Sequence, residues 1–346
     1  MNRIVGMVLC AMLAGAGCSG SGDSNGGAGG TGTAGSGGGS AGSGGGGTAG
    51  SGGGSAGGDG SFSLSIGPIA LAPGQETTQC IVIKMPTTTA QDIIGIGTEL
   101  APGSHHLIAY KSTATSESLT PTPCTSFSGV LNGEAPIFIA DAASQKMTLP
   151  TGVGYHFPAA QMVRIEAHYI NATMTALQGM GTVTFTPGPP MTYQQADIMM
   201  CGSVSALTCP TGGIPPANPD YALPIGTYSG SSSVDFTKLK VFALTSHEHQ
   251  RGSDVKIWKS ATGNPTSQQL FDNPNWSSPP LQVYDDAHLL SFAAGEGLSW
   301  QCSYDSTADN ANVCFGESAA TNEMCFIWAY YYPSVGRFIA QNDCWK

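Results

Sequence analysis

The stretch VRIEAHYI, residues 163–170, decides the fold class. Its apolar residues Val163, Ile165, Ala167 and Tyr169 alternate with polar ones, and this period of two is typical of a β-strand with one buried face. The same alternation recurs in short runs between residues 62 and 304, separated by Pro, Gly, Asn and Asp, and no long stretch has a helical period. The sequence therefore predicts an all-β chain built from antiparallel β-sandwiches.

A Pro-rich passage, TPGPP at residues 186–190, divides this β-rich part into two nearly equal segments. Each segment is long enough to bury a hydrophobic core of its own. We therefore predict one sandwich over residues 61–190 and a second over residues 191–346.

The first 60 residues have a different composition. Arg3, an apolar stretch and then small residues make residues 1–17 similar to an export signal. Cys18 follows the sequence AGAG and resembles the lipidated cysteine of bacterial lipoproteins, with ordinary cleavage nearby as the alternative. The rest of residues 18–60 is rich in Gly, Ser, Ala and Thr and contains the decapeptide TAGSGGGSAG twice, which predicts a disordered linker.

We therefore expect an exported protein held by a lipid anchor at the bacterial outer membrane or cell surface, or a periplasmic or secreted one without the anchor. Ten cysteines fit this compartment. Two of them lie within the first 18 residues, and the even number that remains predicts disulfides.

The charge balance restricts the class of partner. The chain of 346 residues has 12 basic and 23 acidic side chains, so its formal net charge is −11. This charge repels phosphate backbones and argues against a nucleic-acid partner. After residue 18 no apolar run approaches the ~20 residues that a helix needs to cross a bilayer, so membrane contact is expected only through the lipid anchor.

Five of the seven histidines lie in three clusters: His105 with His106, then His168, then His247 with His249. In a strand His247 and His249 share one face, so both imidazoles can reach one ion. The adjacent His105 and His106 point to opposite faces of a regular strand, and to share a metal they need either an irregular backbone or coordination through different ring nitrogens. Solvated surface histidines are the alternative for each cluster alone, and the clustering favours metal binding.

Met324 indicates which metal. It lies in the segment NEMCFIWAYYYP, residues 322–333. A thioether is a ligand for soft copper rather than for zinc or calcium, whereas the alternative for a lone methionine beside aromatic residues is core packing.

Four segments together resemble the copper type II, ascorbate-dependent monooxygenases. They match in order and approximate spacing, across about residues 80–346: HHLIAY at 105–110, EAHY at 166–169, SHEHQRG at 246–252 and NEMCFIWAYYYP at 322–333. The resemblance implies two tandem jelly-roll β-sandwiches, each with one copper ion, that face each other across an open cleft. It also implies hydroxylation of a substrate C–H bond by O2, with ascorbate or a similar external reductant as electron donor.

The resemblance extends to single residues. His105, His106 and His168 match the ligands of an electron-storing copper in the first sandwich. His247, His249 and Met324 match the ligands of a second copper, where oxygen binds and the C–H bond is broken. Cys80 with Cys124, and Cys302 with Cys325, match two disulfides of the family. Cys344 is left with Cys201 or Cys209 as its partner, and Cys314 takes what remains.

The substrate site departs from the pattern of the peptide-amidating relatives. Those proteins hold a substrate carboxylate with Arg, Asn and Tyr, and the matching positions here are Thr245, Phe326 and Trp328, which cannot form a bidentate clamp. On a strand that begins at Met324, Phe326, Trp328 and Tyr330 share one face, either as an aromatic wall beside the copper or as sandwich core. We expect an apolar or aromatic small molecule rather than a glycine-extended peptide as substrate.

Two other hypotheses for the function of the protein are alternatives to an enzyme. One is a non-catalytic copper-binding surface lipoprotein that kept the ligands and lost the substrate site, and the other is a purely structural surface lipoprotein. The six intact ligand positions favour the enzyme. Glu166, two residues before His168, is expected to add negative charge near the first copper.

Overall fold

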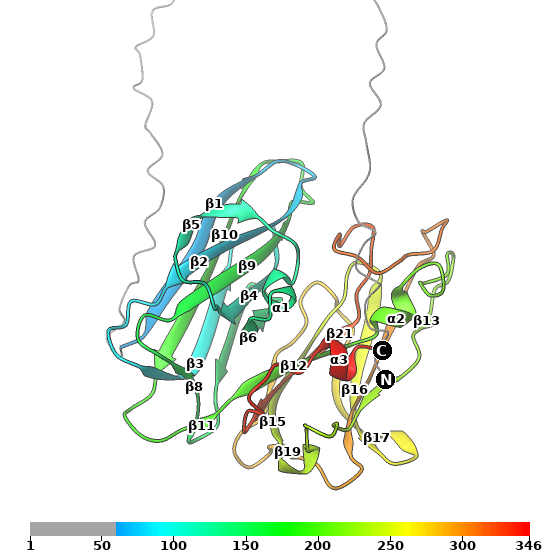
Figure 1. The fold of residues 1–346 in the computed structure, drawn as a ribbon. Helices are drawn as coiled ribbons and strands as arrows, with labels where there is room; N and C mark the ends of the chain where they lie inside the picture. Colours follow the sequence, from blue (N-terminus) through cyan, green and yellow to red (C-terminus); the bar gives the residue numbers. More distant parts are fainter. Residues whose placement is uncertain (1–59) are drawn as a thin grey trace, which may run out of the picture. The chain divides into compact units, whose positions relative to one another are not determined.

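The computed structural model describes residues 60–346, so the expected export signal, Cys18 and almost all of the Gly/Ser-rich linker lie outside the described residues. The described chain is nearly all β, in four sheets (Figure 1). The prediction of an all-β chain with two tandem sandwiches is confirmed.

Two sheets form the first sandwich. One has the strand order β1-β10-β3-β8-β11, with β7 paired to β3. Its strands are β1 (Phe62–Leu71), β3 (Gln91–Leu100), β7 (Ser144–Thr148), β8 (Val153–Phe157), β10 (Leu177–Pro187) and β11 (Gln194–Gln195). The other has the order β5-β2-β9-β4-β6. Its strands are β2 (Glu76–Lys84), β4 (Ser104–Lys111), β5 (Ser118–Pro123), β6 (Ala135–Ala140) and β9 (Met162–Ile170).

Two further sheets form the second sandwich. One has the order β12-β21-β15-β18, with β19 paired to β15. Its strands are β12 (Asp197–Gly202), β15 (Lys240–His247), β18 (Gln282–Val283), β19 (Leu290–Ser291) and β21 (Phe326–Tyr332). The other has the order β13-β20-β16-β17, with β14 paired to β20. Its strands are β13 (Tyr221–Ala222), β14 (Gly226–Tyr228), β16 (Gly252–Ala261), β17 (Asn264–Asn273) and β20 (Gly297–Tyr304).

Helical structure in the described part of the chain is confined to four short segments outside the strands. These are α1 (Ser128–Leu131), α2 (Val204–Leu207), the 3-10 turn η1 (Phe236–Lys238) and α3 (Gln341–Cys344).

The alternation read from the sequence produces these strands directly. In β1, Phe62, Leu64 and Ile66 are buried in the core, while Ser63 and Ser65 on the other face form hydrogen bonds with threonines of β10. Apolar side chains from both sheets of the first sandwich, including Val163 and Ile165 of β9, pack in the same core cluster. The opposed buried faces thus hold the sandwich together.

Strand β21 is buried on both faces. Ile327, Ala329 and Tyr331 belong to the core of the second sandwich. The alternate residues Phe326, Trp328 and Tyr330 pack with the core cluster of the first sandwich instead. This strand therefore separates the core of its own sandwich from the contact with the other one.

Candidate metal centre

The four motifs lie at neighbouring places in the fold. His105 and His106 are in β4, and His168 is in the adjacent strand β9, where its Cα pairs with that of His106. The register of this strand pair shifts between Ser104 and His106, which is the kind of irregular backbone that lets two adjacent histidines share one site. His247 ends β15, and His249 follows in the turn before β16.

The five motif histidines form one buried cluster. Each side chain is at most 7% exposed. Within the first sandwich, the ring centroids of His105 and His168 are 5.3 Å apart, and those of His106 and His168 are 5.2 Å apart. His247 and His249 of the second sandwich are 5.2 Å apart. Each sandwich therefore contributes a compact set of imidazoles.

The two sets also touch each other. The ring centroids of His105 and His247 are 5.1 Å apart, and those of His106 and His247 are 5.0 Å apart. This differs from the expectation of two sites that face each other across an open cleft. The physical reason is the packing of the aromatic face of β21 against the first sandwich, which leaves the two sets in direct contact.

The cluster has the chemistry that a copper ion requires. His105 Nε2, His106 Nδ1 and His247 Nε2 are buried and have no hydrogen-bond partner within residues 60–346. One ligand atom from each of His105, His247 and His249 lies within 4.8 Å of the others. Imidazole nitrogen is a good ligand for copper, and a buried nitrogen without a partner is otherwise costly. These residues fit a bound copper ion.

Burial keeps most of these imidazoles in the form that binds metal. It lowers the pKa of His105, of His106 and of His249 well below the ordinary histidine range, and the neighbouring imidazoles lower each pKa further. A neutral imidazole has a free nitrogen lone pair, which a metal ion needs.

The other ring nitrogens of the cluster have hydrogen-bond partners. His247 Nδ1 lies 2.9 Å from Asp141 Oδ1, and His249 Nδ1 lies 3.1 Å from the backbone carbonyl oxygen of Asn322. His168 Nε2 lies 3.0 Å from Glu76 Oε1, which leaves Nδ1 as its nitrogen for a metal. Such partners fix the tautomer and the orientation of a ligand histidine.

Met324 is buried, and its backbone is held next to that of His249. The carboxylate of Glu323 accepts hydrogen bonds from the backbone N–H groups of His249, Arg251 and Met324. Burial raises the pKa of Glu323 to about 7, although these N–H groups oppose the rise. Glu323 therefore joins the SHEHQRG turn to the segment that contains Met324, which is 2% exposed.

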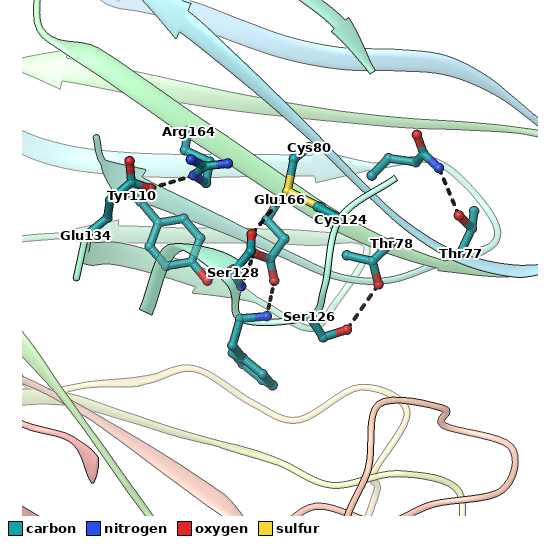
Figure 2. The surroundings of a disulfide bond; sticks show 12 residues. Thr77, Thr78, Cys80, Tyr110, Cys124, Ser126, Ser128, Glu134, Arg164 and Glu166 are labelled. Atoms are coloured by element: carbon teal, nitrogen blue, oxygen red, sulfur yellow. Dashed lines mark hydrogen bonds and ion pairs between the residues drawn. A yellow bond between two sulfur atoms is a disulfide. The ribbon is translucent and has the colours of Figure 1, made fainter. Parts of the chain in front are cut away.

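Glu166, two residues before His168 on β9, is held by hydrogen bonds at the start of α1. Its carboxylate accepts hydrogen bonds from the backbone N–H groups of Phe127 and Ser128 and from the Ser128 hydroxyl. Figure 2 shows this carboxylate beside the Cys80–Cys124 disulfide, with Ser128 bonded to it. Glu166 thus fixes the start of α1.

Phe127 is the residue that this arrangement presents to the second sandwich. Its backbone is left-handed, with φ at 58°. Its ring centroid lies 5.7 Å from that of His106, 5.6 Å from that of Phe326 and 6.1 Å from that of Trp328. One side chain of the first sandwich therefore contacts both the histidine cluster and the aromatic face of β21.

The expected substrate residues share one face of the sheet. Thr245 of β15 pairs with Trp328 of β21, and the next pair on the same face is His247 with Phe326. All four side chains are at most 1% exposed. Thr245 Oγ1 and Trp328 Nε1 have no hydrogen-bond partner in the described part of the chain. Phe326, Trp328 and Tyr330 are fully buried in the core cluster that includes the first sandwich, and the other face of β21 belongs to the second core cluster.

The remaining histidines lie apart from the cluster. The side chains of His156 and His288 are 49% and 74% exposed, and they pair with Asp92 and Asp285. Arg251 forms an ion pair with Asp309. All three residues therefore have acidic partners outside the histidine cluster.

The eight cysteines of the described chain form four disulfides. Cys80–Cys124 and Cys302–Cys325 are the two pairs that the resemblance implies. Cys201 pairs with Cys344, and Cys209 with Cys314, which answers the question that the sequence left open. Four disulfides indicate folding in an oxidising compartment. No helix within residues 60–346 has the length and apolar character needed to span a membrane.

The sequence did not point to Asp141, Glu76, Phe127 or Glu323. Asp141 follows the apolar run PIFIA of β6, so a charged residue at the end of a buried strand was its signal. Glu323 directly precedes Met324 in a motif already singled out. Glu76 and Phe127 have no comparable signal, because their partners are remote in the sequence.

Comparison with known proteins agrees with this site. Residues 194–344 match the family model described as "Copper type II ascorbate-dependent monooxygenase, C-terminal domain". The chain is 26% identical to the Caenorhabditis briggsae protein named "Tyramine beta-hydroxylase", over 76% of this chain and 46% of that protein. It is 23% identical to "DBH-like monooxygenase protein 1" of Gallus gallus, over 58% of this chain and 34% of that protein. The chain spans less than half the length of these relatives.

The likeness to solved structures is weak. The major capsid protein P2 of bacteriophage PM2 aligns with 78% of this chain and 96% of its own chain, at 9% identity and a TM-score of 0.30.

The fold and the site define a protein of paired β-sandwiches with a buried cluster of imidazoles suited to copper. The second sandwich, within residues 194–344, is similar to the C-terminal domain of the copper type II, ascorbate-dependent monooxygenases. The resemblance read from the four motifs is thereby confirmed.

Proposed function

We propose that this protein is a copper-dependent monooxygenase that hydroxylates a C–H bond of an apolar or aromatic small organic molecule, with O2 and an external reductant such as ascorbate. The observation that carries the proposal is the convergence of five motif histidines in one buried cluster, three of them with a ring nitrogen that has no hydrogen-bond partner among residues 60–346. A structural role gives no reason to bury unpaired imidazoles.

In this proposal the chain holds two copper ions. His105, His106 and His168 bind one, and His247, His249 and Met324 bind the other. When bound, copper supplies one-electron transfer and the activation of dioxygen, and a thioether ligand favours its reduced form. Asp141 and the Asn322 carbonyl keep His247 and His249 in the tautomer with a free Nε2. Burial of the cluster limits the access of water to it.

The substrate binds on the face of β15 and β21 next to His247. Phe326, Trp328 and Tyr330 offer area and stacking to an apolar or aromatic molecule. The unpartnered Thr245 hydroxyl and Trp328 indole N–H can hydrogen-bond a polar atom of that molecule and so orient it. Because these residues are buried beneath Phe127, the substrate must displace this contact when it enters.

An exported location follows from the same proposal. The four disulfides support an oxidising compartment, and residues 1–18 carry the expected export signal and lipid-anchor cysteine. The lipid anchor at the bacterial outer membrane is an expectation from residues outside the described ones.

The proposal is tested by copper analysis and oxygen uptake on the purified protein with ascorbate. We expect two coppers per chain and uptake that depends on an added phenolic or aliphatic compound. Met324→Ala should lose nearly all of this uptake, because the second site loses its thioether, while the copper bound by the first site stays. Met147→Ala is the matched control, since Met147 is a buried core methionine on β7 of the first sandwich.

Two results would contradict the enzyme. One is zinc in place of copper. The other is stable binding of two coppers without substrate-dependent uptake across the panel, which would leave the non-catalytic copper protein. Appreciable hydroxylation of a peptidyl-glycine would contradict the expected substrate class.

A further inference from the structure

We propose that Asp141, a residue of the first sandwich, positions His247 of the second sandwich for metal binding. This inference rests on the proposed function, in which His247 is a copper ligand. His247 Nδ1 and Asp141 Oδ1 are 2.9 Å apart, and both side chains are 1% exposed. The bond crosses between the sandwiches, because Asp141 follows β6 and His247 ends β15.

The bond selects one tautomer of His247. A carboxylate oxygen accepts hydrogen bonds, so the single proton of a neutral imidazole is drawn to Nδ1. The lone pair is then on Nε2, the atom that has no partner within residues 60–346. Asp141 thus holds His247 with its metal-binding nitrogen free and its ring turned away from Asp141.

The backbone around Asp141 is fixed by contacts with both sandwiches. The Ile139 N–H donates to the hydroxyl oxygen of Tyr330, on β21 of the second sandwich, at 3.0 Å. The Asp141 N–H donates to Gln145 Oε1 at 3.0 Å, and Gln145 Nε2 donates to the Pro279 carbonyl oxygen at 3.2 Å. Since Pro279 is also in the second sandwich, the carboxylate is placed by the contact between the sandwiches. A placed carboxylate loses little entropy when it orients a ligand.

Apart from His247, no group within residues 60–346 compensates the negative charge of the Asp141 side chain. Its second oxygen, Oδ2, is buried without a hydrogen-bond partner within residues 60–346. A buried carboxylate with one hydrogen bond costs stability unless positive charge is nearby. A copper ion on His247 supplies that charge through the imidazole. The second metal site is therefore complete only when the two sandwiches are in contact.

The protein contains a matched control for this pair. Asp92 Oδ1 lies 3.2 Å from Nδ1 of His156, another aspartate–histidine pair of the first sandwich. His156 is exposed and lies outside the cluster. Asp92→Asn therefore makes the same chemical change as Asp141→Asn without touching a proposed ligand.

The experiment compares Asp141→Ala, Asp141→Asn and Asp92→Asn in the complete mature protein. Cu(I) affinity is measured by competition with a chromogenic chelator, and the Cu(II) environment by electron paramagnetic resonance. His247→Ala in the wild-type background identifies the copper population that depends on His247. We expect Asp141→Ala to weaken that population about 10- to 100-fold and to change its hyperfine splitting. Asp141→Asn, which keeps an acceptor oxygen, should show a smaller loss, and Asp92→Asn none.

The inference is overturned if both Asp141 variants keep the wild-type affinity and spectrum of the His247-dependent copper. If Asp141→Ala fails to fold, Asp141→Asn decides alone, because wild-type copper binding in it overturns the inference and selective loss of the His247-dependent copper supports it. Failure of the proposed function has different signatures: His247→Ala loses no copper if His247 is not a ligand, and the wild type binds copper without substrate-dependent oxygen uptake if the protein is not an enzyme.

Discussion

At the scale of single residues, the site depends on carboxylates that hold backbone and imidazole groups in place. The Glu323 carboxylate accepts hydrogen bonds from three backbone N–H groups, those of His249, Arg251 and Met324. Glu76 contacts His168 and also accepts hydrogen bonds from the Ser318 hydroxyl and the Ala319 N–H of the second sandwich. The donors offset part of the cost of burying each acid. Where burial still raises the pKa of an acid, the stability of the fold depends on pH.

Asp197, the first residue of β12, is such an acid. Burial raises the pKa of Asp197 from its ordinary 3.8 to about 6, although the Ile198 N–H and the Ser334 hydroxyl oppose the rise. Between these two values the folded chain keeps a proton that the unfolded chain has lost. The free energy of unfolding should therefore fall as pH rises from about 4 to about 6, and stay lowered above that.

Asp197→Asn removes this ionisation. Relative to the wild type, the variant should gain about 2 kcal/mol as pH rises from 4 to 7, a figure that allows for the partial exposure of Asp197. Urea unfolding at pH 4.5 and pH 7.5 measures the gain, with Asp220→Asn as an exposed control. A stability difference between variant and wild type that is the same at both pH values would show that burial of Asp197 carries no such penalty.

At the scale of elements, β21 and α1 form the contact that brings the histidine sets together. β21 turns Phe326, Trp328 and Tyr330 toward the first sandwich and its other residues toward its own core. Phe127, at the start of α1, contacts this face of β21. The Glu166 carboxylate sets the position of Phe127 by accepting a hydrogen bond from its backbone N–H. The aromatic contact is therefore specified by one strand face and one fixed turn.

The left-handed backbone of Phe127 leads us to predict an unusual order of stability for two variants of this residue. Phe127→Ala should destabilise the protein by about 3 kcal/mol, because a buried ring is lost. Phe127→Gly loses the same ring but removes the cost of a positive φ, so it should be more stable than Phe127→Ala by up to about 1 kcal/mol. Denaturant unfolding of both variants measures this order. The reverse order, which is usual at other positions, would contradict it.

At the scale of the whole molecule, the sequence was sufficient to predict the β-sandwiches and the motif segments, because both depend on local sequence pattern. The alternation in segments such as residues 62–66 and 163–169 is sufficient for sandwiches, because period two determines which face is buried. The four motif segments were recognisable because each keeps its residues close together in the sequence. An irregular strand was one of two ways in which two adjacent histidines could share a metal, and a register shift lies between Ser104 and His106.

The contacts between remote segments could not be predicted in the same way. Asp141 and His247 are 106 positions apart, and the bond between them exists only because two separate sandwiches meet. The partner of Cys344 stayed open for the same reason, since its spacing fits either candidate. The hydrogen bonds from the 127–128 backbone to the Glu166 carboxylate could not be predicted for the same reason, because nothing in the local pattern reveals them.

The most direct test of the account is copper X-ray absorption of the ascorbate-reduced protein, in the wild type and in Met324→Ala. If imidazoles from both sandwiches and the thioether of residue 324 hold the metal, the wild type will show nitrogen and sulfur scattering, and the variant will keep the nitrogen and lose the sulfur. Nitrogen and oxygen scattering alone in the wild type, identical to that of the variant, would contradict the assignment of Met324 and with it the proposed oxygen-binding site.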